Sequence, residues 1–311
     1  MTEPHDLVTA TELPGDAGDE PARSLWSDAW REMRRRPVFW TASLLIVLVV
    51  AMAAVPGLFT SRDPGYCLLT EARQTPSAAH LFGTDIQGCD VYARTIYGAR
   101  SSVLVGLLTV TLTTLVGGFI GTVSAYYGGW LDALLSRLGE IFFAIPTLLG
   151  GIVILYSLKK PGVTPPYLVV VLQVVMAIAV LGWPSVARIM RGSVLQVKPQ
   201  EYVLAAKALG ASPWRVITSH ILPNSIAAVT VVATINLGLY IAVEATLSFL
   251  GIGLQAPVIS WGIAISEASG LGYILQAPHM LLFPSLFLSL TVLAFILLGE
   301  VVRDALDPKL R

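Results

Sequence analysis

Few residues in this chain are spaced for catalysis. The sequence has no GxxxxGK[ST] loop to hold nucleotide phosphates, and no HExxH, CxxC or GxSxG motif. Its 4 histidines are scattered through a predicted tail and predicted loops: His5, His80, His220 and His279. We therefore expect no catalytic residue, no metal site and no cofactor on the chain itself.

Glu244 is a carboxylate inside an apolar stretch. If that stretch crosses a membrane, the charge costs on the order of 3 kcal/mol on insertion scales, so the side chain must face a cavity or find a polar partner. Glu244 is then either a residue of a pathway through the membrane or a structural, hydrogen-bonded glutamate near the outer boundary. The structural interpretation is preferred. Asn236, earlier in the same stretch, raises the same question with less weight.

Cys67 and Cys89 are the only 2 cysteines. Both fall in one segment, which we predict to lie outside the membrane before the second apolar stretch. An oxidising compartment would permit a disulfide between them. Free thiols are the alternative, and the spacing does not choose between the two.

Composition places these residues in a membrane protein. Hydrophobic residues make up 55% of the 311, charged residues 13%, and the mean hydropathy is +0.72, outside the usual range of soluble domains. A helix needs roughly 20 apolar residues to cross the hydrocarbon core. Six stretches have about that length: 38–58, 102–127, 134–157, 167–187, 225–250 and 281–302. The predicted fold is all-α and polytopic, with six transmembrane helices between residues 38 and 311.

The basic residues give this fold an orientation. With the N-terminus in the cytoplasm, six crossings place 14 of the 20 Lys and Arg residues in inner segments, as the positive-inside rule expects. Both termini are then cytoplasmic. Residues 1–23 are predicted to be a disordered cytoplasmic tail. Residues 24–37 are either an amphipathic helix at the interface or a simple topology signal.

Three other features concern packing and breaks in the helices. Residues 251–280 are apolar but interrupted by glycines and Pro257, and we prefer a short extracytoplasmic or re-entrant segment to a seventh span. Pro146 is expected to bend the helix of its stretch. Gly117 and Gly121 form a GxxxG pair that is interpreted as helix packing.

Residues 199–223 are a polar interruption on the predicted cytoplasmic side. Pro199 suits the first turn of a helix and Gly210 suits the left-handed position that ends one. Ser212 can cap a second helix that starts at Pro213 and is limited by Pro223. The sequence therefore predicts a helix-turn-helix element, with its first helix at about 199–209.

This element must dock outside the bilayer, because neither helix is long enough to span. Ala205, Ala206 and Ala208 leave one surface nearly without side chains, which allows close backbone approach. That surface suits insertion into a groove on another protein. Packing against the helix ends of its own chain is an equal alternative.

The stretch resembles the EAA loop of ABC-importer permeases, with its Glu-Ala-Ala, a Gly four residues on, and a later Ile and Leu-Pro. The matching residues are Ala205, Ala206, Gly210, Ile221, Leu222 and Pro223. Leu204 stands at the position of the family Glu, and Glu201 lies three residues earlier. Further landmarks resemble dipeptide and oligopeptide permease C subunits: SLWSDAWREMRRRP, HLFGTDIQGCDVYARTIYGARSSVLVG, YYGGWLDALLSRLGEIFFAIPTLL and ATLSFLGIGLQAPVISWG. Cys89 replaces the Arg of the family's Gly-Arg-Asp pattern.

The resemblance implies a non-catalytic permease subunit of a peptide importer in the bacterial plasma membrane. Such a subunit pairs with a homologous second permease, docks on cytoplasmic ABC ATPases that bind ATP and Mg, and receives peptide from an extracytoplasmic substrate-binding protein. Lipid is the other partner expected, and nucleic acid is not. Coupling to the ATPase would fall on Glu201, Ala205, Ala206, Gly210, Ala211, Ser212 and Pro213.

Two other functions remain. Nickel or haem is the rival cargo within the family. From a different class, a secondary transporter acting alone would need buried ionisable pairs for proton or sodium coupling, and the predicted spans contain few.

Overall fold

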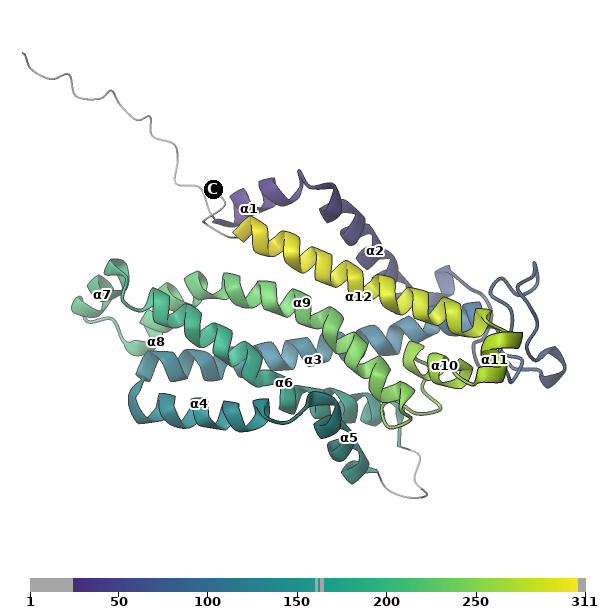
Figure 1. Cartoon of the computed structure of the whole chain (residues 1–311). Coiled ribbons are helices and arrows are strands. Elements are labelled where there is room, and N and C mark those ends of the chain that lie inside the picture. Colours follow the sequence, from purple (N-terminus) through teal and green to yellow (C-terminus); the bar gives the residue numbers. More distant parts are fainter. Residues whose placement is uncertain (1–24, 160–161, 163–164, 307–311) are drawn as a thin grey trace, which may run out of the picture.

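Long apolar helices form the body of the protein (Figure 1). The computed structural model describes residues 25–159, 162 and 165–306, and within these ranges all regular elements are helical. Five helices are long and apolar enough to cross a membrane: α2 (Pro37–Ala54), α3 (Val91–Tyr127), α6 (Tyr167–Val197), α9 (Leu222–Phe249), with the turns that precede it, and α12 (His279–Leu306). The predicted tail at 1–23 lies outside the described residues.

The helices extend past the apolar stretches that predicted them. α3 begins 11 residues before the predicted start at 102, because Asp90 caps it: the Asp90 carboxylate accepts a hydrogen bond from the backbone N–H of Ala93 at 2.8 Å. α6 likewise continues to Val197. Hydropathy marks where a helix can meet lipid, whereas these polar turns pack on other parts of the chain.

The predicted span at 134–157 is not one helix. It is divided into α4 (Gly129–Phe143) and α5 (Thr147–Leu158), which meet at an angle of 86°. The break falls at Pro146, whose ring removes a backbone donor and disfavours helical geometry at the residue before it. The expected bend is therefore present, but it is sharp enough to end the helix. Six spans result only if this pair counts as one.

The polar interruption also differs from the prediction. Its first helix, α7, covers Glu201–Ala208, and Gly210 adopts a φ of +82° as expected. The second helix, α8 (Pro213–Val216), does not end at Pro223 but continues through a π-helical turn, Ile217–Ile221, into α9. Leu222 donates its backbone N–H to the carbonyl of Ile217, five residues back. Pro223 is accommodated beside this wider turn, in the first turn of α9.

Residues 251–280 hold two helices too short to span: α10 (Trp261–Ala268) and α11 (Leu271–Gln276). They lie at the end of the bundle opposite α7 (Figure 1). Trp261 is fully buried and donates its indole N–H to the carbonyl of Thr95 in α3 at 2.8 Å. A seventh span is therefore not formed, and whether this segment enters the membrane stays a prediction.

Glycines bring α3 and α6 together. A Cβ added at Gly117 would lie 2.6 Å from the carbonyl oxygen of Trp183, and one added at Gly121 would lie 2.4 Å from that of Ala187. No side chain fits there, so the two backbones pack directly. The GxxxG pair is a packing feature, as predicted.

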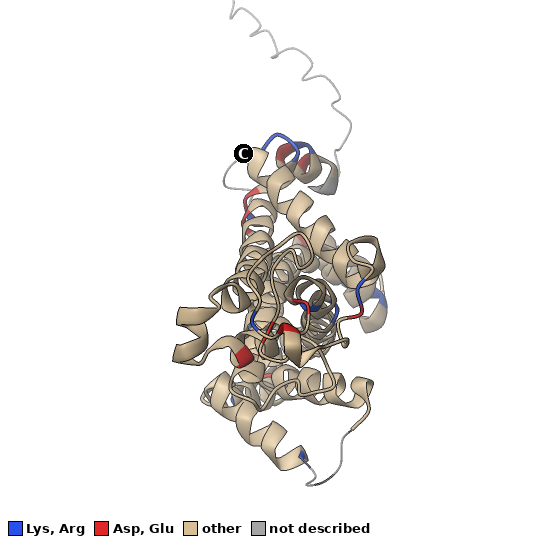
Figure 2. Ribbon diagram, turned by 90° about the vertical axis from the view of Figure 1, so that its right-hand side faces the viewer, with Lys and Arg blue, Asp and Glu red and all other residues tan. Residues whose placement is uncertain are grey.

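α1 (Leu25–Met33) lies against one end of α12, at the same end of the bundle as α7 (Figure 1). Ala29 is buried, and Arg36 forms an ion pair with Asp304 at 2.5 Å. Viewed from the opposite end, charged positions gather in α1 and in the loops, while most of the helical ribbon carries none (Figure 2). This distribution matches a bundle whose middle meets lipid.

Candidate functional site

The inner side of the polar element is packed on the chain's own helices. Val203 of α7, Val216 of α8 and Ile221 are all fully buried. They share one apolar cluster with residues of α3, α6 and α9: Ala125, Val186, Met190, Val194 and Val229. One half of the packing alternative is therefore correct.

Its outer side carries large apolar side chains with no partner in this chain. Leu209 is 88% exposed and Trp214 is 73% exposed, and Leu204 and Tyr202 are also exposed. Apolar groups gathered at the tip of a short element mark a contact surface for another protein. This surface is bulkier than the bare alanine face that the sequence suggested.

The predicted coupling residues occupy this outer side and its rim. Glu201, Ala205, Gly210, Ser212 and Pro213 are exposed, whereas Ala206 and Ala211 are half-buried. Ser212 caps α8 as predicted, accepting a hydrogen bond from the backbone N–H of Arg215 at 3.4 Å.

Basic side chains fix the element to the end of α3. Lys198 donates hydrogen bonds to the backbone carbonyls of Ala125 and Tyr126, at 3.1 and 2.8 Å. These carbonyls belong to the last turn of α3, where a cation also meets the negative end of the helix dipole. Lys207 of α7 lies 5.3 Å from the ring centroid of Tyr126. The base of the element is therefore held by charge as well as by apolar packing.

A second ion pair lies beside this base. Arg191 of α6 donates from Nε and a terminal nitrogen to the two carboxylate oxygens of Asp132 in α4, at 2.7 and 2.6 Å. The sequence analysis did not single out Asp132. The available signal was a lone acid at the start of an apolar stretch, where a charge needs a partner.

Glu244 is fully buried within this chain. Ser248 donates its hydroxyl to one carboxylate oxygen at 2.7 Å, and the backbone N–H of Leu254 donates to that hydroxyl at 2.9 Å. The other carboxylate oxygen and the hydroxyl of Ser102 have no hydrogen-bond partner. Glu244 thus ties α9 to the segment that follows it. Asn236 is half-buried, with an unpartnered amide nitrogen, and the transport role of both residues stays a prediction.

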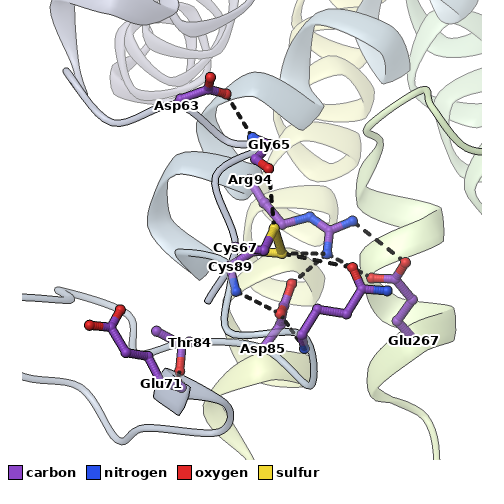
Figure 3. Close-up of a disulfide and its surroundings, with 10 residues drawn as sticks. Asp63, Gly65, Cys67, Glu71, Thr84, Asp85, Cys89, Arg94 and Glu267 are labelled. Carbon is purple, nitrogen blue, oxygen red and sulfur yellow. Dashed lines mark hydrogen bonds and ion pairs between the residues drawn. A yellow bond between two sulfur atoms is a disulfide. The ribbon is translucent and has the colours of Figure 1, made fainter. Parts of the chain in front are cut away.

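Cys67 and Cys89 form a disulfide, so of the two alternatives the structure has the bonded one (Figure 3). Their Cα atoms are 4.1 Å apart. Next to the bridge, the largely buried Arg94 of α3 pairs with Asp85 and, at 2.9 Å, with Glu267 of α10. The bridge and these pairs hold the loop against the bundle.

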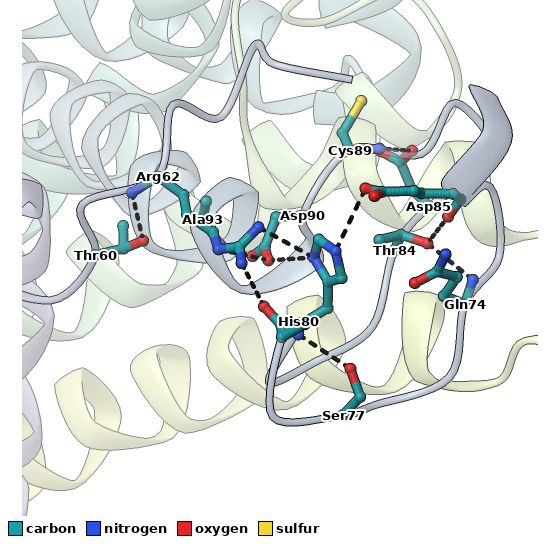
Figure 4. A network of polar contacts seen from close by, with 12 residues as sticks. Thr60, Arg62, Gln74, Ser77, His80, Thr84, Asp85, Cys89, Asp90 and Ala93 are labelled. Carbon is teal, nitrogen blue, oxygen red and sulfur yellow. Dashed lines mark hydrogen bonds and ion pairs between the residues drawn. The ribbon is translucent and has the colours of Figure 1, made fainter. Parts of the chain in front are cut away.

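A polar network fixes the other side of the same loop (Figure 4). The ring of His80 is buried and lies 2.9 Å from the carboxylate of Asp90, the residue that caps α3. Arg62 lies 3.7 Å from the same carboxylate and donates to the carbonyl of Ala79 at 2.6 Å. In the part of the chain that the structure describes, no cluster of His, Cys, Asp or Glu could hold a metal ion.

Comparison with known proteins places both parts of the chain. Residues 114–311 match the family described as binding-protein-dependent transport system inner membrane component, and residues 24–76 match the N-terminal TM domain of oligopeptide transport permease C. A dipeptide transport system permease protein DppC of Bacillus subtilis is 39% identical, covering 95% of this chain and 89% of that protein. The oligopeptide transport system permease protein OppC of the same organism is 38% identical, covering 93% and 91%. A glutathione transport system permease protein GsiD of Pectobacterium atrosepticum is 35% identical, covering 94% of each.

Solved structures show the same helical arrangement. An inward-facing structure of the MetNI methionine ABC transporter aligns with a TM-score of 0.54 at 19% identity, covering 68% of this chain and 96% of that chain. An amino acid ABC transporter aligns with a TM-score of 0.51, also at 19% identity, covering 67% and 91%. At this identity the likeness concerns the fold alone.

Proposed function

Because the chain belongs to the family of binding-protein-dependent transport system inner membrane components, we propose that it imports dipeptides or oligopeptides as one permease subunit of an ABC transporter. The observation that carries the cargo is the near full-length identity, 39% and 38%, to a dipeptide and an oligopeptide permease. The glutathione permease among its relatives also carries a peptide in its name.

In this proposal the polar element at 199–223 receives the force of ATP hydrolysis. Its outer residues, Leu209 and Trp214 above all, would sit in a groove of a cytoplasmic ATPase that binds ATP and Mg. Its inner residues are packed on α3, α6 and α9. A short stiff element fixed in this way can turn ATPase closure into a rigid-body movement of the helices.

The remaining partners follow from the family. A homologous second permease would complete the pathway, and an extracytoplasmic binding protein would deliver the peptide. Both termini would be cytoplasmic, because α1, α7 and the end of α12 lie at one end of the bundle (Figure 1) and the basic residues favour that side. α1 would then lie at the cytoplasmic interface, with the exposed Arg31, Arg34 and Trp30 near lipid headgroups.

Peptide uptake into proteoliposomes tests the proposal. The chain is reconstituted with a candidate second permease, ATPase and binding protein, and uptake of a labelled dipeptide is followed with and without ATP. We expect uptake only when ATP and all partners are present. Preparations that lack one component serve as controls. Peptide uptake by this chain alone would contradict the proposal and favour a secondary transporter.

A further inference from the structure

α4 stands away from the rest of the bundle. None of its 15 residues is fully buried, whereas its neighbours α3 and α6 pack backbone to backbone. A cavity of about 400 Å³ separates α4 from α3 and α6. It is lined by residues of all three helices, among them Gly121, Ser124, Leu135, Gly139, Pro184 and Ala187.

Both ends of α4 are joints. Gly128 and Gly129 connect it to α3 with φ values of +68° and +60°, a conformation that side-chain-bearing residues rarely adopt. At the other end, the break at Pro146 separates it from α5 at 86°. A helix between two such joints can turn as one body.

Two contacts with α6 hold this helix in place. Near Pro146, Phe142 packs on Trp183 with ring centroids 5.7 Å apart, and the guanidinium of Arg188 lies 4.3 Å from the ring of Phe143. Near the glycine joint, the contact is the ion pair between Asp132 and Arg191.

The ion pair is the polar and directional contact of the two. Both carboxylate oxygens of Asp132 accept from Arg191, and the hydroxyl of Ser124 donates to one of them. Side-chain exposure is 38% for Arg191 and 20% for Asp132. A bidentate, charge-assisted pair fixes orientation as well as distance.

Arg191 also belongs to the helix that leads into the coupling element. It lies about two turns before the end of α6. Between the two, Val194 packs in the same cluster as Val203 of α7 and Val216 of α8. A displacement of α7 and α8 therefore reaches Arg191 through packed side chains, without a flexible loop between them.

We propose that the Asp132–Arg191 pair is the link that transmits movement of the coupling element to α4 and α5. The two residues are positioning residues for transport: they make α4 follow the end of α6, while the glycine joint and the break at Pro146 let α4 turn. This inference rests on the proposed import function, because it assumes that the coupling element is moved by an ATPase.

The test is the number of peptides imported per ATP hydrolysed by the full reconstituted transporter. Arg191→Lys keeps the charge but loses the two-pronged contact, and Asp132→Asn keeps the shape but loses the charge. Both variants should assemble and hydrolyse ATP while importing about fivefold or more fewer peptides per ATP, within the usual range of coupling between sites. The swapped variant Asp132→Arg/Arg191→Asp should recover much of this ratio.

Arg137→Gln is the matched control, because Arg137 lies on α4 with its side chain 80% exposed, paired only with its neighbour Glu140. It should import at the wild-type ratio. A wild-type ratio in Arg191→Lys would overturn the inference, and so would a swapped variant that regains ATP hydrolysis without regaining import. If the wild-type transporter itself imports no peptide, the proposed function fails instead, so the two failures are distinguishable.

Discussion

At Glu244, a carboxylate inside an apolar helix has its hydrogen bonds arranged by its own chain. The link from Glu244 through Ser248 to the backbone N–H of Leu254 joins α9 to the segment before α10. A polar group buried in this way stabilises the fold only while its partners remain, because an orphaned donor or acceptor carries the full cost of desolvation.

Substitution of Glu244 separates its structural interpretation from a role in the pathway. Glu244→Gln retains the shape and the acceptor for Ser248, so we expect nearly wild-type thermal stability and peptide uptake. Glu244→Ala leaves Ser248 without its acceptor and should cost about 1–3 kcal/mol of unfolding free energy, seen as a lower denaturation midpoint of the purified complex. Stable Glu244→Gln protein that loses most uptake would instead place the carboxylate in the transport pathway.

Among the elements, the coupling segment has two faces with different tasks. Its inner face is part of the bundle's apolar cluster, and its outer face presents Leu209 and Trp214 to solvent in this chain. Changes on the outer face should therefore act on partner binding while leaving the fold intact, since exposed positions contribute little to stability.

Leu209→Asp tests this division. Leu209 is 88% exposed, so the variant should insert and fold normally, yet a charge at the centre of an apolar contact should reduce recovery of the ATPase subunit about tenfold or more. Co-purification measures this recovery. Leu275→Asp is the control, because Leu275 is 76% exposed on α11 at the opposite end of the bundle. Equal ATPase recovery with both variants would exclude the coupling surface. Gly210→Asp should behave like Leu209→Asp.

For the whole molecule, the ends of the bundle differ in construction. One end carries α1, α7 and the basic residues that fix them, and the other carries the disulfide-bonded loop with α10 and α11 (Figure 1). A disulfide persists in an oxidising compartment and not in the cytoplasm. This agrees with the side that the basic residues predict, and it uses an independent property of the chain.

Cysteine labelling of intact cells tests this orientation. Leu275→Cys should react with a membrane-impermeant maleimide added outside, and Leu209→Cys should react only after the membrane is opened. The two native cysteines are bonded to each other and should stay unlabelled. Wild-type protein provides that background. Labelling of Leu209→Cys in sealed cells would reverse the predicted topology.

The sequence by itself determined the class of the protein and the place of its coupling element. Apolar stretches, the bias in basic residues and the spacing of Gly210 and Pro213 are local properties, and each records an energy that one residue or one turn contributes. The absence of a phosphate-binding loop likewise directed attention to a partner ATPase. These features could be read without knowing which helices touch.

Only the tertiary structure decided where helices end and which distant residues pair. The continuity of α8 with α9, the break at Pro146 and the early start of α3 at Asp90 depend on how backbone groups are satisfied by neighbours. Asp132 and Arg191 are 59 residues apart, and Cys67 and Cys89 are 22 apart. Such pairs depend on the register between packed helices and loops, which is set by the summed contacts of the whole bundle and leaves no mark in a local pattern.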